Sequence, residues 1–220
     1  MNEQPFVYLL PQAVRPDPSG VAQLSWPVGK HPFGTSAALD MNPAANAIQL
    51  SRGVLSPEEC RCVIDLGEAL PIRQGGVEDG HALYRLSNIA WIEPAPDTHW
   101  LFHKLGMAFL AANRGYGFEL VGLIDALQYT VYGPGQYFEW HMDLGPDVTS
   151  ARKLSMTIQL SPSADYDGGG LEFINAPSRE EAREQGAATV FPSYLAHRVI
   201  PVTRGVRRSL VAWASGNTFR

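Results

Sequence analysis

The segment YGPGQYFEWHMD, residues 132–143, carries the pattern on which the fold and the chemistry of this chain depend. It opens on a Gly-Pro-Gly turn and continues through aromatic residues that favour a β-strand. In a strand, His141 and Asp143 share one face because they are two residues apart, and Met142 points to the other face. The pair therefore predicts two metal ligands that reach one point. The plainer alternative is a hydrogen-bonded structural histidine.

A second histidine lies further along the chain. His197 follows the turn FPSY (191–194) at the start of another run of β-forming residues. Two imidazoles and one carboxylate form the facial triad that holds non-haem iron(II) and leaves three coordination positions open. A closed structural zinc site needs a fourth protein ligand, and none is suitably spaced. We therefore predict that His141, Asp143 and His197 are the metal ligands and form the catalytic centre.

An arginine follows this second histidine. Arg207 lies ten residues after His197, and Ser209 is two residues further on the same strand face. A guanidinium grips a carboxylate through two parallel hydrogen bonds, and a nearby hydroxyl adds another. Because a buried arginine is costly without an anion, a carboxylate ligand would explain this residue. The alternative is a surface arginine, since Arg204 and Arg208 cluster with it near a turn.

Short runs of β-forming residues fill the chain from about residue 118 onward. Turns rich in glycine and proline and a charged loop at residues 178–186 separate them. The runs are FELVGLIDALQYTVY (118–132), KLSMTIQLS (153–161), GGLEFI (169–174), AATVFP (187–192), HRVIPV (197–202) and RRSLVAWAS (207–215). Many short strands at this spacing predict a sandwich, a barrel or a double-sheet jelly roll.

Two helices are predicted ahead of these strands. The first begins at SPEE (56–59), where the serine caps the helix, the proline takes the first helical position and the second glutamate completes a capping box. Apolar residues then recur at helical spacing until Pro71 ends the element. The second helix follows residue 97 and ends near residues 113–115. Residues 82–92, between the two helices, alternate as a strand. We expect both helices to cover one sheet.

The domain organisation follows from the composition. We expect a single domain over residues 48–220, with its core at about 118–215. Residues 1–47 are rich in proline, glycine and asparagine and form an arm of uncertain role, with short strands at 5–10 and 21–26.

Charge and cysteine content narrow the class of protein. The formal net charge is −5, which argues against nucleic acid or an anionic membrane as the main partner. The N-terminus lacks a basic segment followed by an apolar run, and no stretch is apolar enough to cross a membrane, so we expect a cytoplasmic protein.

Cys60 and Cys62 are two apart in a predicted helix, where their side chains diverge, so we expect both thiols to stay unpaired.

Residues 127–215 resemble the 2-oxoglutarate/iron(II) dioxygenase superfamily, in particular the prolyl 4-hydroxylase-like domain and its bacterial PKHD-type relatives. The segments that carry the resemblance are YGPGQYFEWHMD (132–143), RKLSMTIQLS (152–161), DYDGGGLEF (165–173) and FPSYLAHRVIPVTRGVRRSLVAW (191–213). The resemblance implies a mainly β fold with supporting helices around a double-stranded β-helix, which is a cupin-like jelly roll with the metal near one mouth.

The resemblance also assigns roles to individual residues. It implies that His141, Asp143 and His197 bind iron(II), and that Arg207 binds the distal carboxylate of the cosubstrate 2-oxoglutarate. Tyr132 matches a tyrosine that lies against the cosubstrate in relatives.

Four further positions complete the implied cosubstrate pocket. Gln159 stands where relatives often carry a tyrosine that reaches the same carboxylate, so it departs from the family pattern. Ser155 and Thr157 share the strand face of Gln159 and are expected to line the pocket. Trp213 matches a tryptophan beside the cosubstrate, although a buried aromatic residue of the core would look the same.

Candidate substrate residues lie outside these motifs. They are Tyr84, Arg85, Trp91 and Trp140. Arg85 is expected either to pair with a carboxylate of the substrate or to be a surface charge on an edge strand. Trp140 adjoins His141 but alternates to the other face, which favours an ordinary core residue.

The implied reaction is hydroxylation of an unactivated C–H bond by dioxygen, coupled to conversion of 2-oxoglutarate to succinate and carbon dioxide, with ascorbate as the reductant. The family points to a prolyl or other residue in a protein or peptide, and the alternative substrate is a free amino acid or small metabolite. Two alternative functions are a catalytically inactive jelly-roll binding module and a cupin-like metal protein with a different mechanism. The oligomeric state stays open, with a homodimer as one alternative.

Overall fold

The computed structural model describes residues 47–75, 84–174, 176 and 179–218, together with the backbone of four short strands nearer the N-terminus. These strands are β1 (Phe6–Tyr8), β2 (Gln12–Ala13), β3 (Leu24–Ser25) and β4 (Phe33–Thr35). The chain divides into two compact units, Met1–Asn42 and Pro43–Arg220. In the first unit β1 pairs with β4 and β2 with β3, both antiparallel. The rest of the predicted arm lies outside the described residues.

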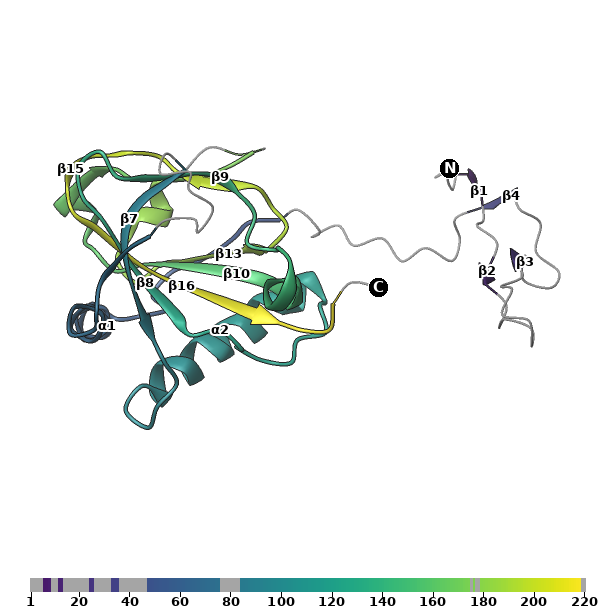
Figure 1. Ribbon diagram of the computed structural model, residues 1–220, viewed down its shortest axis with the longest axis horizontal. Coiled ribbons are helices and arrows are strands. Elements are labelled where there is room, and N and C mark those ends of the chain that lie inside the picture. The colour runs from purple at the N-terminus through teal and green to yellow at the C-terminus, as the bar shows by residue number, and fades with distance from the viewer. Residues whose placement is uncertain are drawn as a thin grey trace. The chain divides into compact units, whose positions relative to one another are not determined.

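The second unit is built on a curled antiparallel sheet (Figure 1). Its strands are β5 (Gln49–Ser51), β6 (Arg73–Gly75), β7 (Arg85–Ile92), β8 (Leu127–Tyr132), β9 (Tyr137–His141), β10 (Arg152–Gln159), β12 (Leu171–Phe173), β13 (Ala188–Pro192), β14 (His197–Val199) and β16 (Arg207–Ser215). Their order is β12-β14-β9-β7-β8-β16-β10-β13-β5, and β6 pairs with β7. A separate pair joins β11 (Tyr166–Gly168) to β15 (Val202–Gly205). This arrangement confirms the predicted mainly β, jelly-roll-like fold.

Strand β7 connects the two parts of this sheet. Its first residues, Arg85 and Leu86, pair with β9, whereas Asn88–Ile92 pair with β8. One strand therefore runs from the β9–β14 region, where the sequence places the metal ligands, into the wide part of the sheet.

The helices begin as the sequence predicts. In α1 (Pro57–Glu68), Ser56 is the N-cap, and both hydrogen bonds of the capping box to Glu59 are present. Helix α2 (His99–Tyr116) ends at the left-handed Gly117, whose φ is 71°. The predicted end at residues 113–115 was too early, because Gly117 is the glycine that takes the cap conformation. Short 3-10 segments are η1 (Asp147–Ala151), η2 (Ser163–Asp165) and η3 (Glu180–Arg183).

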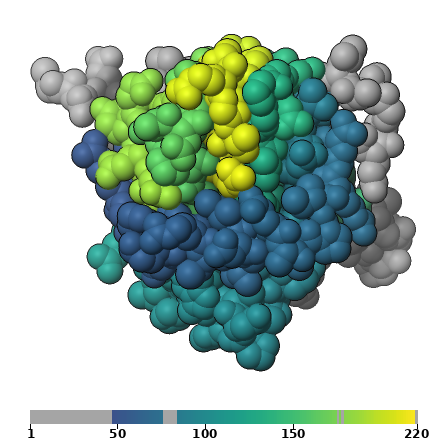
Figure 2. Space-filling model, turned by 90° about the vertical axis from the view of Figure 1, so that its left-hand side faces the viewer, coloured from purple at the N-terminus to yellow at the C-terminus, as the bar shows by residue number. Residues whose placement is uncertain are grey.

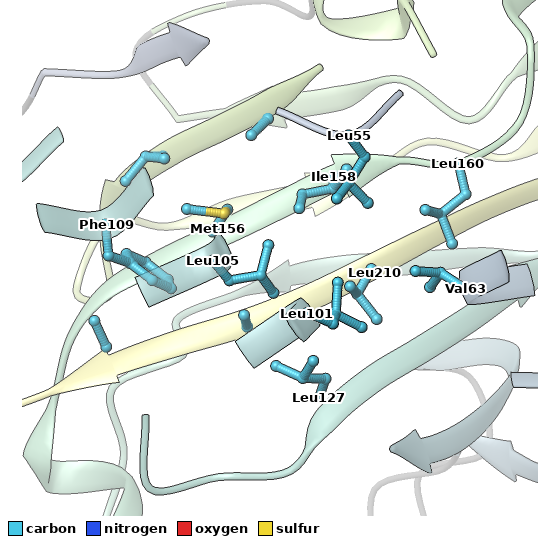
Figure 3. Close-up of a cluster of buried hydrophobic side chains, with 14 of the residues drawn as sticks. Leu55, Val63, Leu101, Leu105, Phe109, Leu127, Met156, Ile158, Leu160 and Leu210 are labelled. Atoms are coloured by element: carbon cyan, nitrogen blue, oxygen red, sulfur yellow. The ribbon is translucent and has the colours of Figure 1, made fainter. Parts of the chain in front are cut away.

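Both helices pack on the same side of the sheet, as expected. Figure 3 shows side chains of α2 meeting those of β10 and β16 in an apolar cluster. The labelled members that are at most 1% exposed are Leu55, Val63, Leu101, Leu105, Phe109, Leu127, Met156, Ile158, Leu160 and Leu210. Within α1, Cys60 points into this cluster and Cys62 is exposed, and both thiols are free, as predicted. In Figure 2 the dark-blue segment that contains α1 crosses one face of the molecule below the yellow and green strands.

No helix in the described part of the chain is both long enough and apolar enough to span a bilayer.

Candidate metal centre

The three predicted metal ligands converge at the junction of β9 and β14. His141 is the last residue of β9, His197 is the first residue of β14, and the two are direct partners in the ladder. Asp143 was expected inside the strand, but β9 ends at His141 and Asp143 lies in the following turn. The backbone N–H groups of Asp143 and Leu144 both donate to the Ser193 carbonyl, at 3.0 and 2.9 Å. The ligand atoms of the triad all lie within 4.8 Å of one another.

Backbone carbonyls orient both imidazoles. His141 Nδ1 lies 2.7 Å from the Glu139 carbonyl, and His197 Nδ1 lies 2.9 Å from the Leu195 carbonyl. A carbonyl only accepts, so each Nδ1 carries the proton and each Nε2 keeps its lone pair. The Nε2 atoms stand 3.8 and 3.7 Å from the two carboxylate oxygens of Asp143. Both lone pairs are thus available to one ion next to the carboxylate.

Ser155 holds the carboxylate, and Ser193 contacts Ser155. Ser155 Oγ donates to Asp143 Oδ2 at 2.6 Å and lies 3.0 Å from Ser193 Oγ. Ser155 was expected to line the pocket, but it is buried and its hydroxyl is engaged with Asp143. Sequence reasoning missed Ser193, and the only hint was its place in the turn before His197. These contacts fix the direction in which Asp143 presents its oxygens.

The protonation states suit a metal. Burial, with His197 nearby, lowers the pKa of His141 to about 4. Burial alone would raise the pKa of the Asp143 carboxyl, but the imidazoles and the Ser155 hydroxyl hold it below its ordinary value. A neutral imidazole and an ionised carboxylate are the forms that ligate a cation.

The triad opens into a cavity of about 380 Å³. The predicted site residues that line it are Tyr84, Arg85, Trp91, Tyr132, Thr157, Arg207, Ser209 and Trp213, besides the triad itself. Three other predicted site residues, Ser155, Gln159 and Trp140, do not line it.

Arg207 is the buried member of the arginine cluster. It is 3% exposed and lies opposite Tyr132 across the β8–β16 ladder. Arg204 and Arg208 point outward and pair with Asp167 and Glu68. Arg207 Nε donates to Gln159 Oε1 at 3.1 Å, and its buried Nη1 has no hydrogen-bond partner among the described residues. A buried guanidinium with an unused donor fits an anionic ligand such as a carboxylate.

Gln159 supports Arg207 instead of facing the cavity. Its side-chain oxygen accepts from Arg207, and its Nε2 donates to the Arg208 carbonyl at 3.2 Å. Gln159 pairs with Ser209 in the β10–β16 ladder, which brings it beside Arg207. Gln159, which replaces the tyrosine of the family pattern, therefore contacts Arg207 directly.

A second arginine in the cavity is already neutralised. Arg152 forms two hydrogen bonds to the carboxylate of Asp125, at 2.9 and 3.2 Å, and its guanidinium lies 3.8 Å from the Trp213 ring centroid. Trp91 packs against the same tryptophan, with ring centroids 6.2 Å apart. Sequence reasoning missed Arg152 and Asp125, which are 27 residues apart and form no local motif.

Two candidate substrate residues differ from their expected surroundings. Arg85 lies in the cavity, so the alternative of a surface charge on an edge strand is wrong. Trp140 is 37% exposed and packs under Arg198, whose guanidinium is 4.8 Å from the ring centroid. The core position expected for Trp140 is therefore wrong, because the outer face of β9 is open to solvent at this point.

Comparison with known proteins agrees with this site. The model of the 2OG-Fe(II) oxygenase superfamily matches residues 127–215. A PKHD-type hydroxylase of Idiomarina loihiensis is 36% identical over 83 residues, which cover 37% of this chain and 38% of the relative. A PKHD-type hydroxylase of a Synechococcus species is 35% identical over 120 residues, which cover 50% and 53% of the two chains. The chain thus spans about two-fifths to one-half of the length of these relatives.

Solved structures show the same fold at low sequence identity. A Pseudomonas putida prolyl-4-hydroxylase aligns with a TM-score of 0.63 and 22% identity, over 79% of this chain and 95% of that one. A prolyl hydroxylase from Trichoplax adhaerens, solved with a peptide fragment of the hypoxia inducible factor oxygen degradation domain, aligns with a TM-score of 0.60 and 18% identity, over 77% and 84%. Residues 127–215, the part of the chain that matches the model of the 2OG-Fe(II) oxygenase superfamily, contain the triad and Arg207.

Proposed function

We propose that this chain is an iron(II)- and 2-oxoglutarate-dependent oxygenase that hydroxylates an unactivated C–H bond and converts 2-oxoglutarate to succinate and carbon dioxide. The observation that carries the proposal is one cavity that contains both the convergent His-Asp-His cluster and a buried arginine with an unused donor. The cluster supplies three ligands on one side, and the arginine supplies the anchor for a carboxylate.

His141, Asp143 and His197 would hold the iron(II), and bound iron would supply the activation of dioxygen with 2-oxoglutarate as the electron donor. Arg207 would take the distal carboxylate of 2-oxoglutarate, with the Ser209 hydroxyl beside it on the same strand face. Ascorbate as reductant and a cytoplasmic location are also part of the proposal.

The chain's own residues orient these groups and shield them. Ser155 keeps one oxygen of Asp143 fixed, so that the carboxylate does not rotate away from the imidazoles. Trp91 and Trp213 form an apolar wall of the cavity. Arg152 is paired with Asp125 and does not compete with Arg207 for the cosubstrate's charge. A partly dry wall next to fixed charges strengthens the attraction for a carboxylate.

The substrate is proposed from two separate observations. A prolyl or other residue in a protein or peptide is favoured by the Trichoplax structure, which contains a peptide fragment. A free amino acid or small metabolite is favoured by the cavity itself, which measures about 380 Å³ and is lined by an additional arginine, Arg85. Ligand sites for small molecules fall in this size range.

The test uses the full chain with iron(II), ascorbate and 2-oxoglutarate. We expect succinate to form above the level of a His141→Ala control, as measured by mass spectrometry. We also expect Mn(II) together with N-oxalylglycine, an unreactive analogue of 2-oxoglutarate, to raise the Tm of the wild type but not of the variant. An inactive binding module would show the stabilisation without succinate. If neither response appears, the proposal is wrong.

A further inference from the structure

Arg85 is a third, partly buried arginine in the cavity, and the proposed cosubstrate does not use it. It is the first residue of β7 and lies directly opposite Phe138 of β9. Its guanidinium stacks on the Phe138 ring at 4.5 Å, and that ring stacks on His141 with centroids 3.5 Å apart. Arg85 therefore stands one aromatic ring away from a candidate metal ligand, at a distance suited to a molecule bound next to the metal.

The hydrogen bonds of Arg85 do not include a carboxylate, although the charge of Asp143 acts on it from nearby. Its Nε donates to Ser87 Oγ at 2.8 Å, and its Nη2 is buried without a hydrogen-bond partner in the described part of the chain. Its other polar neighbour is the Tyr132 hydroxyl. Burial raises the pKa of Tyr132, so this hydroxyl stays neutral and does not balance the charge. Burial lowers the pKa of Arg85, and the nearby Tyr132 and Asp143 offset this effect only in part.

The three arginines of the cavity therefore differ in the partners that they already have. Arg152 is paired with Asp125. Arg207 is supported by Gln159 and keeps a free donor for the far carboxylate of 2-oxoglutarate. Arg85 has a free donor and no acidic residue among its hydrogen-bonding neighbours. The cosubstrate has one carboxylate for Arg207 and one next to the metal, so Arg85 is left for a different molecule.

The fold makes room for Arg85. Gly75 of β6 pairs with Ser87 of β7. A Cβ at residue 75 would come within 2.8 Å of Ser87 Oγ and 2.9 Å of Arg85 Nε. Contacts this short would force the arginine to shift, so glycine at this position lets the guanidinium lie beside the strand.

We propose that Arg85 binds a carboxylate of the primary substrate, and that this substrate is a small free acid of the amino-acid size class. The assignment rests on the proposed function. A guanidinium binds a carboxylate through two parallel hydrogen bonds, and the position of Arg85 over the Phe138 ring restricts where its guanidinium can lie. Trp91, 40% exposed in the same cavity, offers an apolar surface to the rest of the molecule.

The experiment compares acids with otherwise identical neutral molecules. The full chain is loaded with Mn(II) and N-oxalylglycine and then mixed with a pool of the twenty L-amino acids, with the matching pool of carboxamides, or with capped peptides that contain internal Asp and Glu. We expect the acid pool alone to raise the Tm further, by about 2 °C or more. Arg85→Gln should lose this rise while keeping the response to N-oxalylglycine. Arg198→Gln is the matched control, because Arg198 pairs with Glu172 outside the cavity.

Two further variants guard against simple misfolding. Arg85→Lys keeps the charge without the planar fork and should bind the acids at least about fivefold more weakly. Gly75→Ala keeps the arginine but displaces it, and should weaken the acids without changing the response to N-oxalylglycine.

The outcomes separate this inference from the proposed function. The inference is overturned if the acid pool does not raise the Tm of the wild type, or if it raises the Tm of Arg85→Gln equally. A rise with capped peptides equal to that with free acids overturns the assignment to a small molecule. Loss of the N-oxalylglycine response in Arg85→Gln would place Arg85 in the cosubstrate site instead. Failure of the wild type to respond to Mn(II) and N-oxalylglycine would count against the proposed function itself.

Discussion

Strands β10 and β16 present two different surfaces to the molecule. On the helix side, Leu154, Met156 and Ile158 of β10 are 0% exposed and pack in the apolar cluster. The opposite face of the same strand is called the cavity side because its Thr157 lines the cavity; there Ser155 holds a candidate metal ligand and Gln159 holds Arg207. Because side chains alternate along a strand, one register fixes both surfaces, and a slip of one residue would exchange them.

The two surfaces do different work for the molecule. The helix side is packed with buried apolar residues, which contribute mainly to the free energy of unfolding. On the cavity side, Arg85 and Arg207 each have a buried donor atom without a partner among the described residues, which a protein selected only for stability would not keep. Substitutions on the helix side should therefore change stability, and substitutions on the cavity side should change binding.

The largest expected effect is on the cavity side. Asp143→Ala removes the carboxylate between the two imidazoles, so we expect Mn(II) affinity to fall by at least about 100-fold, since even residues behind a ligand are worth 10- to 100-fold. The protein should stay folded, because Asp143 lies outside the apolar cluster. Calorimetric titration with Mn(II) measures the loss. Asp167→Ala, which removes an exposed carboxylate paired with Arg204, is the control and should bind Mn(II) normally. Equal affinity in both variants would remove Asp143 from the site.

The next effect belongs to the helix side. Leu105 of α2 is 0% exposed and packs in the apolar cluster between helix and sheet (Figure 3). Leu105→Ala should lower the free energy of unfolding by about 2–5 kcal/mol, because it removes buried methyl groups and leaves a cavity. Denaturant unfolding measures this change. Affinity for N-oxalylglycine in the folded fraction should stay within twofold of wild type. A large loss of affinity at low denaturant would show that the two surfaces are coupled more tightly than the alternation implies.

A smaller effect is expected at Gln159. Gln159→Leu removes the acceptor that holds Arg207 Nε, so the KM for 2-oxoglutarate should rise about tenfold, which is ~1.4 kcal/mol, with a smaller change in kcat. Gln159→Glu keeps the acceptor but adds a charge that pairs with Arg207, and it should raise the KM more than the leucine does. Arg207→Gln sets the upper limit. If the glutamate variant resembles wild type, Gln159 acts by packing alone.

The motifs predicted which residues lie together better than they predicted the contacts around those residues. The strand alternation and the position of Arg207 relative to His197 depend on local sequence, and both were predicted. The turn that carries Asp143 was missed because the Ser193 carbonyl that fixes it lies 50 residues away in the chain. The role of Gln159 was also missed, since a family pattern suggests a contact with the cosubstrate and only the β10–β16 register reveals the contact with Arg207. Tertiary pairing decides such details, and no local pattern encodes it.

The smallest effect tests whether the helix side is closed to solvent. Cys60 and Cys62 lie on opposite faces of α1, with Cys60 buried and Cys62 exposed. Burial raises the pKa of the Cys60 thiol to about 11, so at pH 8 very little of it is the reactive thiolate. We expect iodoacetamide to label one thiol in the native chain and two after unfolding, and Cys62→Ser to abolish native labelling. The label on Cys62 should leave the Tm nearly unchanged, because that side chain points away from the sheet. Rapid native labelling of both thiols would mean that α1 opens from the sheet, and the contrast between a closed surface and an open one would then no longer hold.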